Sequence, residues 1–267
     1  DRAEELSLKL AGTRHEQAGL KFLLEIYEKE KDWLKAIDIS RRMDSITGQS
    51  SAKDIAHFYC ELAAAEMLHS RPEEARRHLE EAFSVNRKCV RANALLGDLE
   101  AGQQRLTEAV EAWKRIESQN PAYLALVAEK LLEAYQSMGN PDQGLHLLKG
   151  YLASYPSLDL LNVVFRAVVE KEGAKPAYHL VREELRRNPT LLGLDSLLEA
   201  QLLETPVERR HDLELIKNLV HHHTRSLAMY RCDHCGFRAR QFYWHCPACG
   251  HWETYPPRRT EERELAK

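Results

Sequence analysis

Four cysteines near the C-terminus have the residue type and the spacing of a metal site. They form two C-x₂-C pairs, Cys232 with Cys235 and Cys246 with Cys249, and ten residues separate the pairs. A two-residue spacer lets one tight turn present both sulfurs to a single ion, and four thiolates complete a tetrahedral shell. The alternative is a set of free or disulfide-paired thiols. The pattern predicts one tetrahedral metal ion bound by these four cysteines.

Zinc and iron both accept four thiolates, so the cysteines alone leave the identity of the ion open. Residues 246–250 read Cys-Pro-Ala-Cys-Gly, which resembles the knuckle of rubredoxin, an iron protein of electron transfer. The ten-residue gap is much shorter than in that family, which favours zinc over iron. A closed shell also leaves no position for water or substrate. Since no nucleotide-binding or hydrolase signature occurs either, we expect no catalysis.

Composition narrows the class of protein. The chain has 267 residues, a formal net charge of −3 and 30% charged residues, a balance that argues against wholesale nucleic-acid binding. Cys60 and Cys89 are the other two cysteines, and we expect isolated thiols in a reducing compartment. No apolar run approaches the roughly 18 residues of a membrane span. The chain begins at Asp1 without a methionine, as expected for a fragment of a longer protein.

Helix pairs of similar length precede the cysteines and must position them. From about residue 14 to residue 190, apolar residues lie three or four apart. Pro121, Pro156 and Pro189 each follow a helical stretch, at spacings of 35 and 33 residues. This period matches the tetratricopeptide repeat of about 34 residues.

Small residues mark where the second helix of each pair crosses the first, because a large side chain there would force the helices apart. These residues are Ala36, Ala75, Ala109, Gly144 and Ala177. Their gaps of 39, 34, 35 and 33 residues repeat the proline period, which an irregular helical bundle, the alternative, does not explain. The long first gap predicts an extended loop or a lengthened helix pair over residues 45–54.

The predicted fold class is therefore all-α, a tetratricopeptide-repeat solenoid with a small C-terminal module of rubredoxin-like or zinc-ribbon type. We expect about five repeats over residues 1–190, capping helices over 191–228, the four-cysteine module over 229–257 and a charged tail over 258–267. Several aromatic residues of the module are expected to pack around the cysteines, and others to attach the module to the helices.

A solenoid binds partners on the concave face lined by the first helix of each repeat. The predicted groove residues carry charges of both signs or polar groups. They are Lys21, Glu25, His57, Met67, Arg91, Asp98, Glu129, Glu133, Asn162 and Arg166. Trp33 and Trp113 stand at apolar helix positions and are expected to pack inside.

Nucleic-acid binding by the module is the first alternative function. Residues 225–259 hold six arginines, Asp233 and Glu253, so the side chains sum to 6 − 2 = +4. Four thiolates with one divalent ion contribute −2. The remaining +2 is modest for phosphate recognition, which makes nucleic acid an unlikely partner. Electron transfer by a rubredoxin-like iron centre is the second alternative.

The combination of helical repeats with two C-x₂-C pairs resembles a known family. Residues 230–237 read Tyr-Arg-Cys-Asp-His-Cys-Gly-Phe, and residues 245–252 read His-Cys-Pro-Ala-Cys-Gly-His-Trp. Following tetratricopeptide repeats, these motifs resemble the bacterial lipopolysaccharide assembly protein B family over essentially the whole chain. The matched functional residues are the four cysteines.

The resemblance implies an adaptor at the cytoplasmic face of the inner membrane, anchored by an N-terminal transmembrane helix that is not in this chain. It implies three protein partners: the membrane protease FtsH, the deacetylase that commits precursor to lipid A synthesis, and an inner-membrane regulator that senses lipopolysaccharide. The adaptor would promote degradation of the deacetylase by FtsH and so limit lipopolysaccharide production. A homodimer is compatible with the sequence, which does not distinguish it from a monomer.

Overall fold

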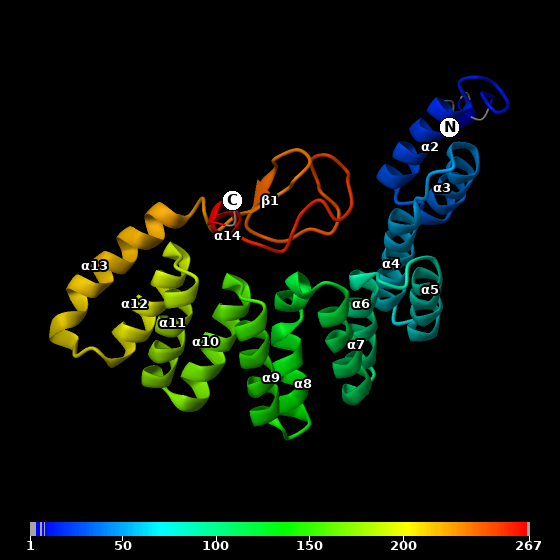
Figure 1. Ribbon diagram of the computed structural model, residues 1–267. Coiled ribbons are helices and arrows are strands. Elements are labelled where there is room, and N and C mark those ends of the chain that lie inside the picture. The colour runs from blue at the N-terminus through cyan, green and yellow to red at the C-terminus, as the bar shows by residue number, and fades with distance from the viewer. Residues whose placement is uncertain (1–3, 6, 8, 266–267) are drawn as a thin grey trace. The chain divides into compact units, whose positions relative to one another are not determined.

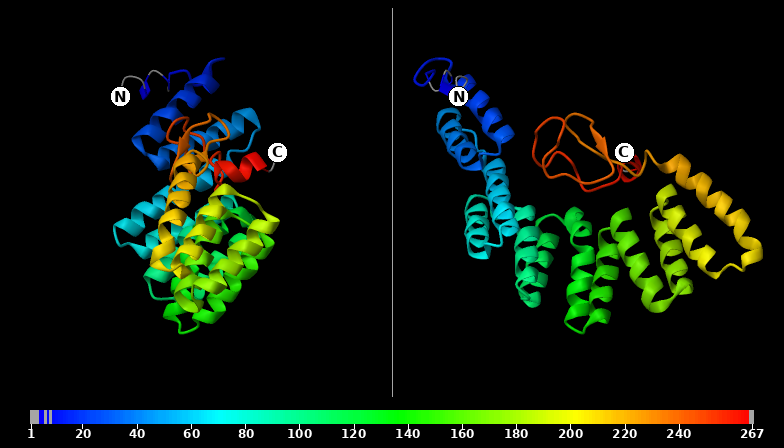
Figure 2. Two further views of the ribbon diagram at one scale, coloured as in Figure 1. Left: turned by 90° about the vertical axis from the view of Figure 1, so that its left-hand side faces the viewer. Right: turned by 180° about the vertical axis from the view of Figure 1, so that it is seen from behind.

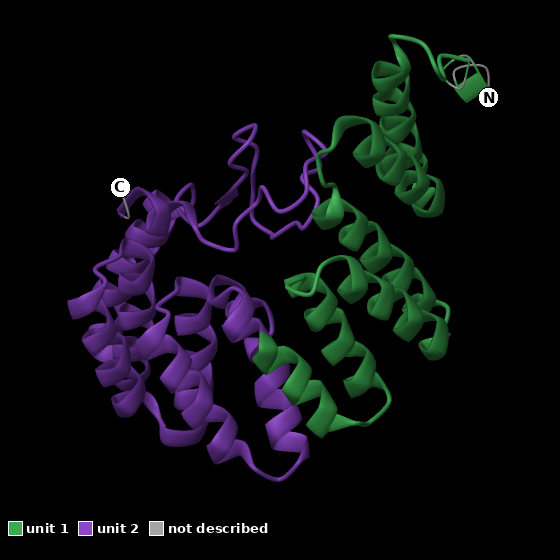
Figure 3. Ribbon diagram, turned by 45° about the vertical axis from the view of Figure 1, so that its right-hand side comes forward, with its two compact units in different colours: residues 1–115 green, residues 116–267 purple. Residues whose placement is uncertain are grey.

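The computed structural model describes residues 4–5, 7 and 9–265. The chain divides into two compact units, residues 1–115 and residues 116–267 (Figure 3). Both units are built from antiparallel helix pairs, and the second also holds the four cysteines. The fold class is all-α with tetratricopeptide repeats, as predicted.

Unit 1 consists of successive helix pairs that are coloured blue to teal in Figure 1. Its helices are α2 (Glu16–Glu30), α3 (Trp33–Thr47), α4 (Ala52–Leu68), α5 (Pro72–Val85), α6 (Val90–Gly102) and most of α7 (Leu106–Gln119). The boundary between the units falls within α7.

Unit 2 continues the pairs and ends in the cysteine module. Its helices are η1 (Pro121–Leu126), α8 (Ala128–Ser137), α9 (Pro141–Ser154), α10 (Leu158–Glu172), α11 (Ala174–Arg187), α12 (Leu191–Glu204), α13 (Val207–Thr224) and α14 (Thr260–Leu265). Strands β1 (Tyr230–Arg231) and β2 (Arg238–Ala239) pair antiparallel, with Tyr230 opposite Ala239. Residues 230–257 are otherwise loops, drawn in orange and red in Figure 2.

The predicted crossing residues all lie on the second helix of a pair. The four alanines at these positions, Ala36, Ala75, Ala109 and Ala177, are 0% exposed. At Gly144, an added Cβ would lie only 2.7 Å from Cβ of Tyr135 on the preceding helix. The crossings thus have room for a methyl group at most, and the repeat register is confirmed.

Both predicted packing tryptophans are buried. Trp33 is 8% exposed and stacks on Phe58 with ring centroids 5.6 Å apart. Trp113 is 2% exposed and donates from Nε1 to the carbonyl oxygen of Ala94, at 3.2 Å. This indole lies directly over Gly97, so α6 and α7 approach closely because Gly97 has no side chain.

The long first gap in the repeat period is taken up mainly by helix length. Helix α3 runs to Thr47, and Gly48 ends it with a φ of 67°. A short loop follows, in which the Asp44 carboxylate accepts from the backbone N–H and hydroxyl of Ser51. Helix α4 then spans 17 residues. The alternative of a lengthened helix pair therefore describes this segment.

Two helices of unit 2, α10 and α12, begin at residues whose side chains cap the helix N-terminus. Ser157 accepts from the N–H of Leu160 at the start of α10, and Thr190 accepts from that of Gly193 at the start of α12. Such side-chain caps satisfy backbone donors that have no partner within the helix. Three further N–H donors at the starts of these two helices are bound by residues near the C-terminus, as described below.

Across the described residues, no helix combines the length and the apolar character that crossing a bilayer demands.

Candidate metal centre

The structure brings the four predicted cysteines together into one cluster. All four Sγ atoms lie within 4.8 Å of one another. The Sγ atoms of Cys232 and Cys249 are 3.8 Å apart, and those of Cys235 and Cys246 are 3.7 Å apart. A tetrahedron with metal–sulfur bonds of about 2.3 Å has sulfur–sulfur edges of about 3.8 Å. The cluster thus has the size of a four-cysteine metal site, and the geometry suits zinc and iron alike.

The same local turn shapes both cysteine pairs. Gly236 donates its N–H to the carbonyl of Cys232 at 3.0 Å, and Gly250 donates to that of Cys246 at 2.9 Å. Both glycines have positive φ, 77° and 69°, a conformation that side chains disfavour. The glycine that follows each C-x₂-C pair is therefore required by the turn that directs two sulfurs to one point.

A short hairpin closes each turn. The N–H of Cys232 donates to the carbonyl of Phe237 at 2.9 Å, and that of Cys246 donates to the carbonyl of His251 at 3.0 Å. Strands β1 and β2 extend the first hairpin, and a bridge between His245 and Trp252 extends the second. The ten-residue gap between the pairs is thus sufficient for two equivalent knuckles.

Burial and neighbouring sulfurs oppose ionisation of two of the four thiols, Cys246 and Cys249. Burial opposes ionisation of Cys232, but the Thr254 hydroxyl and backbone N–H groups outweigh it and lower the pKa of this thiol to about 6. Burial and the neighbouring sulfurs raise the pKa of Cys249 to about 12, and burial also raises that of Cys246. A divalent ion removes this conflict, because it stabilises all four thiolates together.

Three histidines lie against the knuckles. His234 and His251 lie close to Cys249, and their rings stack with centroids 3.8 Å apart and planes 21° apart. His251 Nδ1 lies 2.9 Å from the carbonyl oxygen of Cys249, and His245 Nε2 lies 2.9 Å from that of Gly250.

Aromatic rings attach the module to the helices of unit 2. Trp244 stacks on Tyr123 of η1, with ring centroids 5.0 Å apart and planes 4° apart. Phe242 contacts the same tyrosine edge-on and also packs against Tyr230 and the fully buried Tyr255. One group of rings therefore joins the cysteine module to the repeats, as the aromatic content of the module predicts.

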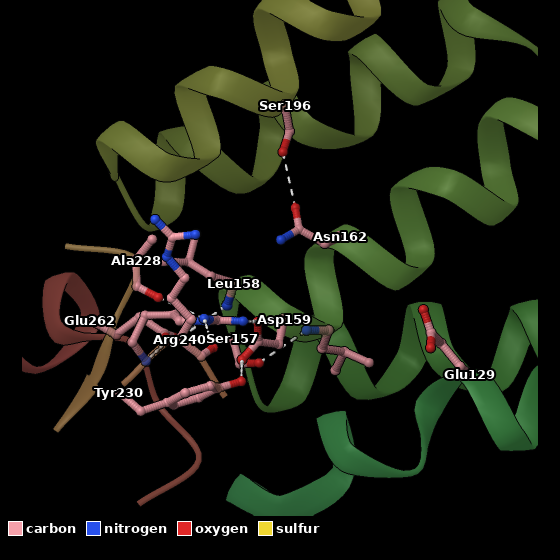
Figure 4. Close-up of polar contacts among 12 residues, drawn as sticks. Glu129, Ser157, Leu158, Asp159, Asn162, Ser196, Ala228, Tyr230, Arg240 and Glu262 are labelled. Carbon is pink, nitrogen blue, oxygen red and sulfur yellow. Dashed lines mark hydrogen bonds and ion pairs between the residues drawn. The ribbon is translucent and has the colours of Figure 1, made fainter. Parts of the chain in front are cut away.

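Asp159, in the first turn of α10, is the polar centre of this attachment (Figure 4). It accepts from the hydroxyl of Tyr230 at 2.6 Å and from Nε and Nη2 of Arg259 at 2.8 and 2.6 Å. The Arg259 guanidinium also lies 4.1 Å from the centroid of the Tyr230 ring, and its Nη1 donates to the carbonyl of Ala228. Three segments distant in sequence are thus fixed by one carboxylate.

Two glutamates of α14 bind the N-termini of repeat helices. Glu262 Oε1 accepts from the N–H of Leu158, at the start of α10, at 3.0 Å. Glu261 accepts from Leu191 and Leu192, at the start of α12, at 2.5 and 2.9 Å. Carboxylates are favourable at these positions because the N–H groups lack helical partners and the helix dipole is positive there. The predicted charged tail therefore includes a helix that joins the module to the repeats.

The predicted groove residues separate into exposed and buried groups. Exposed are Lys21, Glu25, Glu129, Glu133, Asn162 and Arg166, and Met67 and Asp98 are half-buried. His57 and Arg91 are only 1% and 8% exposed, so the prediction that they face a partner is wrong. Arg91 instead donates to the carboxylate of Glu61 on α4, at 2.7 Å.

Three of the exposed groove residues form contacts between the first helices of successive repeats in unit 2. Glu129 on α8 forms an ion pair with Arg166 on α10. Asn162 on α10 accepts from the hydroxyl of Ser196 on α12 at 3.1 Å (Figure 4). Such contacts hold successive repeats in register, and whether these residues also bind a partner stays a prediction.

Asp159, Arg259, Glu261 and Glu262 were not singled out by sequence reasoning. The one sequence signal that could have indicated Asp159 is its place after Ser157, in the first turn of a helix, where acidic residues are common. Nothing local connects it with Arg259, 100 positions away.

Residues 230–257 match the family described as "Rubredoxin metal binding domain". Lipopolysaccharide assembly protein B of Escherichia coli K12 is 29% identical over 259 residues, which are 96% of this chain and 67% of that protein. The protein of the same name from Haemophilus influenzae is 28% identical over 98% of this chain and 66% of its own length. The chain thus spans about two thirds of the length of these relatives.

Among solved structures, the C-terminal part of a TPR repeat-containing protein from Cytophaga hutchinsonii is similar, with a TM-score of 0.48 and 10% identity. The similarity covers 78% of this chain and 81% of that one. The full-length relatives and the match over residues 230–257 confirm that the chain resembles the lipopolysaccharide assembly protein B family, with tetratricopeptide repeats followed by a rubredoxin-type metal-binding domain.

Proposed function

We propose that the chain is a non-catalytic adaptor that regulates lipopolysaccharide synthesis at the inner membrane. In this proposal it presents the deacetylase of the committed step of lipid A synthesis to the membrane protease FtsH for degradation. The names of the relatives support a part in lipopolysaccharide assembly, and the helix-pair fold supports protein binding. A third partner, an inner-membrane protein that senses lipopolysaccharide, would restrain the adaptor.

The observation that carries the proposal is the attachment of the metal module to the repeats. Four sulfurs fill the coordination shell, so the metal has a structural role and offers no position to a substrate. Trp244, Asp159 and the α14 glutamates then fix the module against α10, α12 and η1. A metal that stabilises a docked module suits an adaptor, whose binding surface must keep its shape. We propose zinc as this metal.

The proposed location is the cytoplasmic face of the inner membrane, with an N-terminal transmembrane helix outside these 267 residues. Reduced cysteines in a metal site fit a reducing compartment.

The decisive experiment measures deacetylase turnover in cells that carry full-length protein. Replacing Cys232 and Cys246 by serine removes two ligands, and we expect the deacetylase to persist after translation is stopped. A second variant, Asp159→Asn with Arg259→Gln, keeps the four cysteines but removes the polar attachment, and we expect partial loss of turnover. Arg182→Glu on α11 serves as the control, since this arginine is exposed and no hydrogen bond or ion pair within the described residues joins it to the cysteines or Asp159. Unchanged deacetylase turnover in the cysteine variant would show that the proposal is wrong.

Nucleic-acid binding is less compatible with the arginines of the module. Arg259 pairs with Asp159 on α10, so part of the basic charge of residues 225–259 is neutralised within the chain. A filter-binding titration at low salt distinguishes the two functions, because phosphate contacts strengthen as salt falls. We expect no retention of RNA or DNA.

The electron-transfer alternative depends on the metal. An iron protein of this type is red and loses its colour on reduction, whereas a zinc protein is colourless. Elemental analysis of protein purified without added metal is expected to give one zinc per chain.

A further inference from the structure

A pocket of about 530 Å³ opens in unit 2, and none of the four cysteines lines it. Its walls include the prolines of the three repeat turns, Pro121, Pro156 and Pro189, and its floor includes the buried Leu160 and Leu161. Helix α14 contributes Glu262 and Leu265 to its rim. A concave site of this size with an apolar floor is typical of ligand-binding pockets.

Two arginines, Arg187 and Arg258, and two glutamates, Glu184 and Glu262, line the pocket. The Glu184 carboxylate accepts from the side-chain amide of Asn188 at 2.6 Å, and Glu262 accepts from the backbone N–H groups of Leu158 and Arg259. Both acidic groups are therefore hydrogen-bonded within the chain, and Glu262 also interacts electrostatically with Arg258. Arg187 and Arg258 are exposed, and within the described residues neither guanidinium makes a hydrogen bond or an ion pair.

The chain itself shows which chemistry this edge of the repeats accepts. Helix α14 places two adjacent carboxylates, Glu261 and Glu262, on the N-termini of α12 and α10, while Leu265 lines the pocket. An acidic segment with an apolar residue is thus already bound along this edge. The pocket offers a similar combination, an apolar floor next to two exposed arginines, with no segment of the described chain filling it.

We propose that this pocket binds a short acidic peptide segment of a partner protein. An apolar side chain of the peptide rests on Leu160 and Leu161, and its carboxylates pair with Arg187 and Arg258. The arginine fork suits carboxylates, and partial enclosure strengthens the ion pairs relative to open surface. This inference deepens the proposed adaptor function and rests on it, since it specifies a surface for one protein partner.

The test uses a fluorescein-labelled peptide in which single leucines alternate with pairs of glutamates. Its anisotropy is titrated with the whole 267-residue chain, loaded with zinc. We expect saturable binding that weakens as salt is raised, because the ion pairs are screened. The same peptide with glutamine in place of glutamate should bind about tenfold more weakly, the loss expected when two partly exposed ion pairs disappear.

Variants of the protein locate the binding site. The double variant Arg187→Glu with Arg258→Glu should bind the acidic peptide at least about tenfold more weakly, because attraction becomes repulsion. The matched control is Arg182→Glu, which reverses another exposed arginine of α11 that does not line the pocket. Ala122→Trp, which fills the pocket from η1 without changing charge, should also reduce binding.

Three results would overturn the inference. The first is the absence of saturable binding of the acidic peptide. The second is equal affinity of the wild type and the double arginine variant for this peptide. The third is binding of phosphatidylglycerol vesicles that depends on Arg187 while the peptide does not bind, which would assign the pocket to lipid. Failure here, with deacetylase turnover still lost in the Cys232→Ser and Cys246→Ser variant, would leave the adaptor function standing.

Discussion

Arg259 donates from both Nε and Nη2 to a single oxygen of Asp159, at 2.8 and 2.6 Å, and thereby joins the end of the metal module to the first turn of α10. The two side chains are 22% and 17% exposed, so the pair is largely withdrawn from water. Tyr230 donates to the second carboxylate oxygen. A cationic side chain and a hydroxyl therefore share one carboxylate.

This pair should be energetically coupled. We expect Asp159→Asn to reduce the free energy of unfolding of unit 2 by about 2 kcal/mol, because it leaves a partly buried guanidinium without its partner. A double-mutant cycle with Arg259→Gln should give a coupling energy of about 1 to 2 kcal/mol. Urea unfolding followed by tryptophan fluorescence measures both. Arg258→Gln, one position away and exposed, should change stability by less than about 0.5 kcal/mol. Additive effects of the two substitutions would contradict the coupling.

The α14 glutamates should protect particular backbone amides. In Glu262→Ala, the amides of Leu158 and Arg259 lose their acceptor, and in Glu261→Ala the amides of Leu191 and Leu192 lose theirs. We expect faster hydrogen exchange at those amides only, and a loss of about 1 kcal/mol for each substitution, as for other N-terminal caps.

The control for this experiment is Glu264→Ala on the same helix. Glu264 is exposed and accepts from neither helix N-terminus, so all four amides should exchange at the wild-type rate. Uniformly faster exchange in every variant would show that α14 itself had unfolded, and would contradict separate caps.

The sequence predicted those features that depend on neighbours in the chain. The period of 33 to 35 residues located the crossing residues Ala75 and Ala177, because each repeat is a helix pair of similar length. The C-x₂-C-Gly pattern located the sulfurs, because a local turn brings each pair of cysteines together. Burial of His57 and Arg91 was missed, since periodicity gives the face of a helix but not which neighbouring helix covers it.

Long-range contacts escaped prediction for a related reason. Asp159 meets Arg259 only because repeat stacking and the two knuckles together determine where the chain ends. The same is true of Cys60 and Cys89, expected as isolated thiols, whose buried sulfurs lie 3.9 Å apart on adjacent repeats. Burial raises the pKa of Cys60, which keeps this thiol protonated.

Metal removal should unfold the module and leave the helix pairs intact. The module has a small core around Tyr230 and Tyr255, so metal binding must supply much of its folding free energy, on the order of 10 kcal/mol in comparable zinc domains. Excess chelator should change the fluorescence of Trp244 and Trp252 while helical circular dichroism stays nearly constant, and zinc should restore the signal. Protons compete for sulfur, so metal loss should increase as the pH falls. A large loss of helix on chelation would contradict this division.

Gly97 provides the sharpest test of repeat packing. A Cβ at this position would lie 2.2 Å from Nε1 of Trp113, so the indole would have to move and would lose its bond to Ala94. We expect Gly97→Ala to destabilise unit 1 by about 1 to 3 kcal/mol, the range for overpacked cores. Gly102→Ala on the same helix is the matched control, because an added Cβ there meets no atom within 4 Å. That control should be neutral or stabilising by up to about 1 kcal/mol, since alanine favours the helix. The difference between the two variants in thermal unfolding isolates the contact with Trp113, and equal effects of the two alanines would show that helix propensity alone determines stability at this crossing.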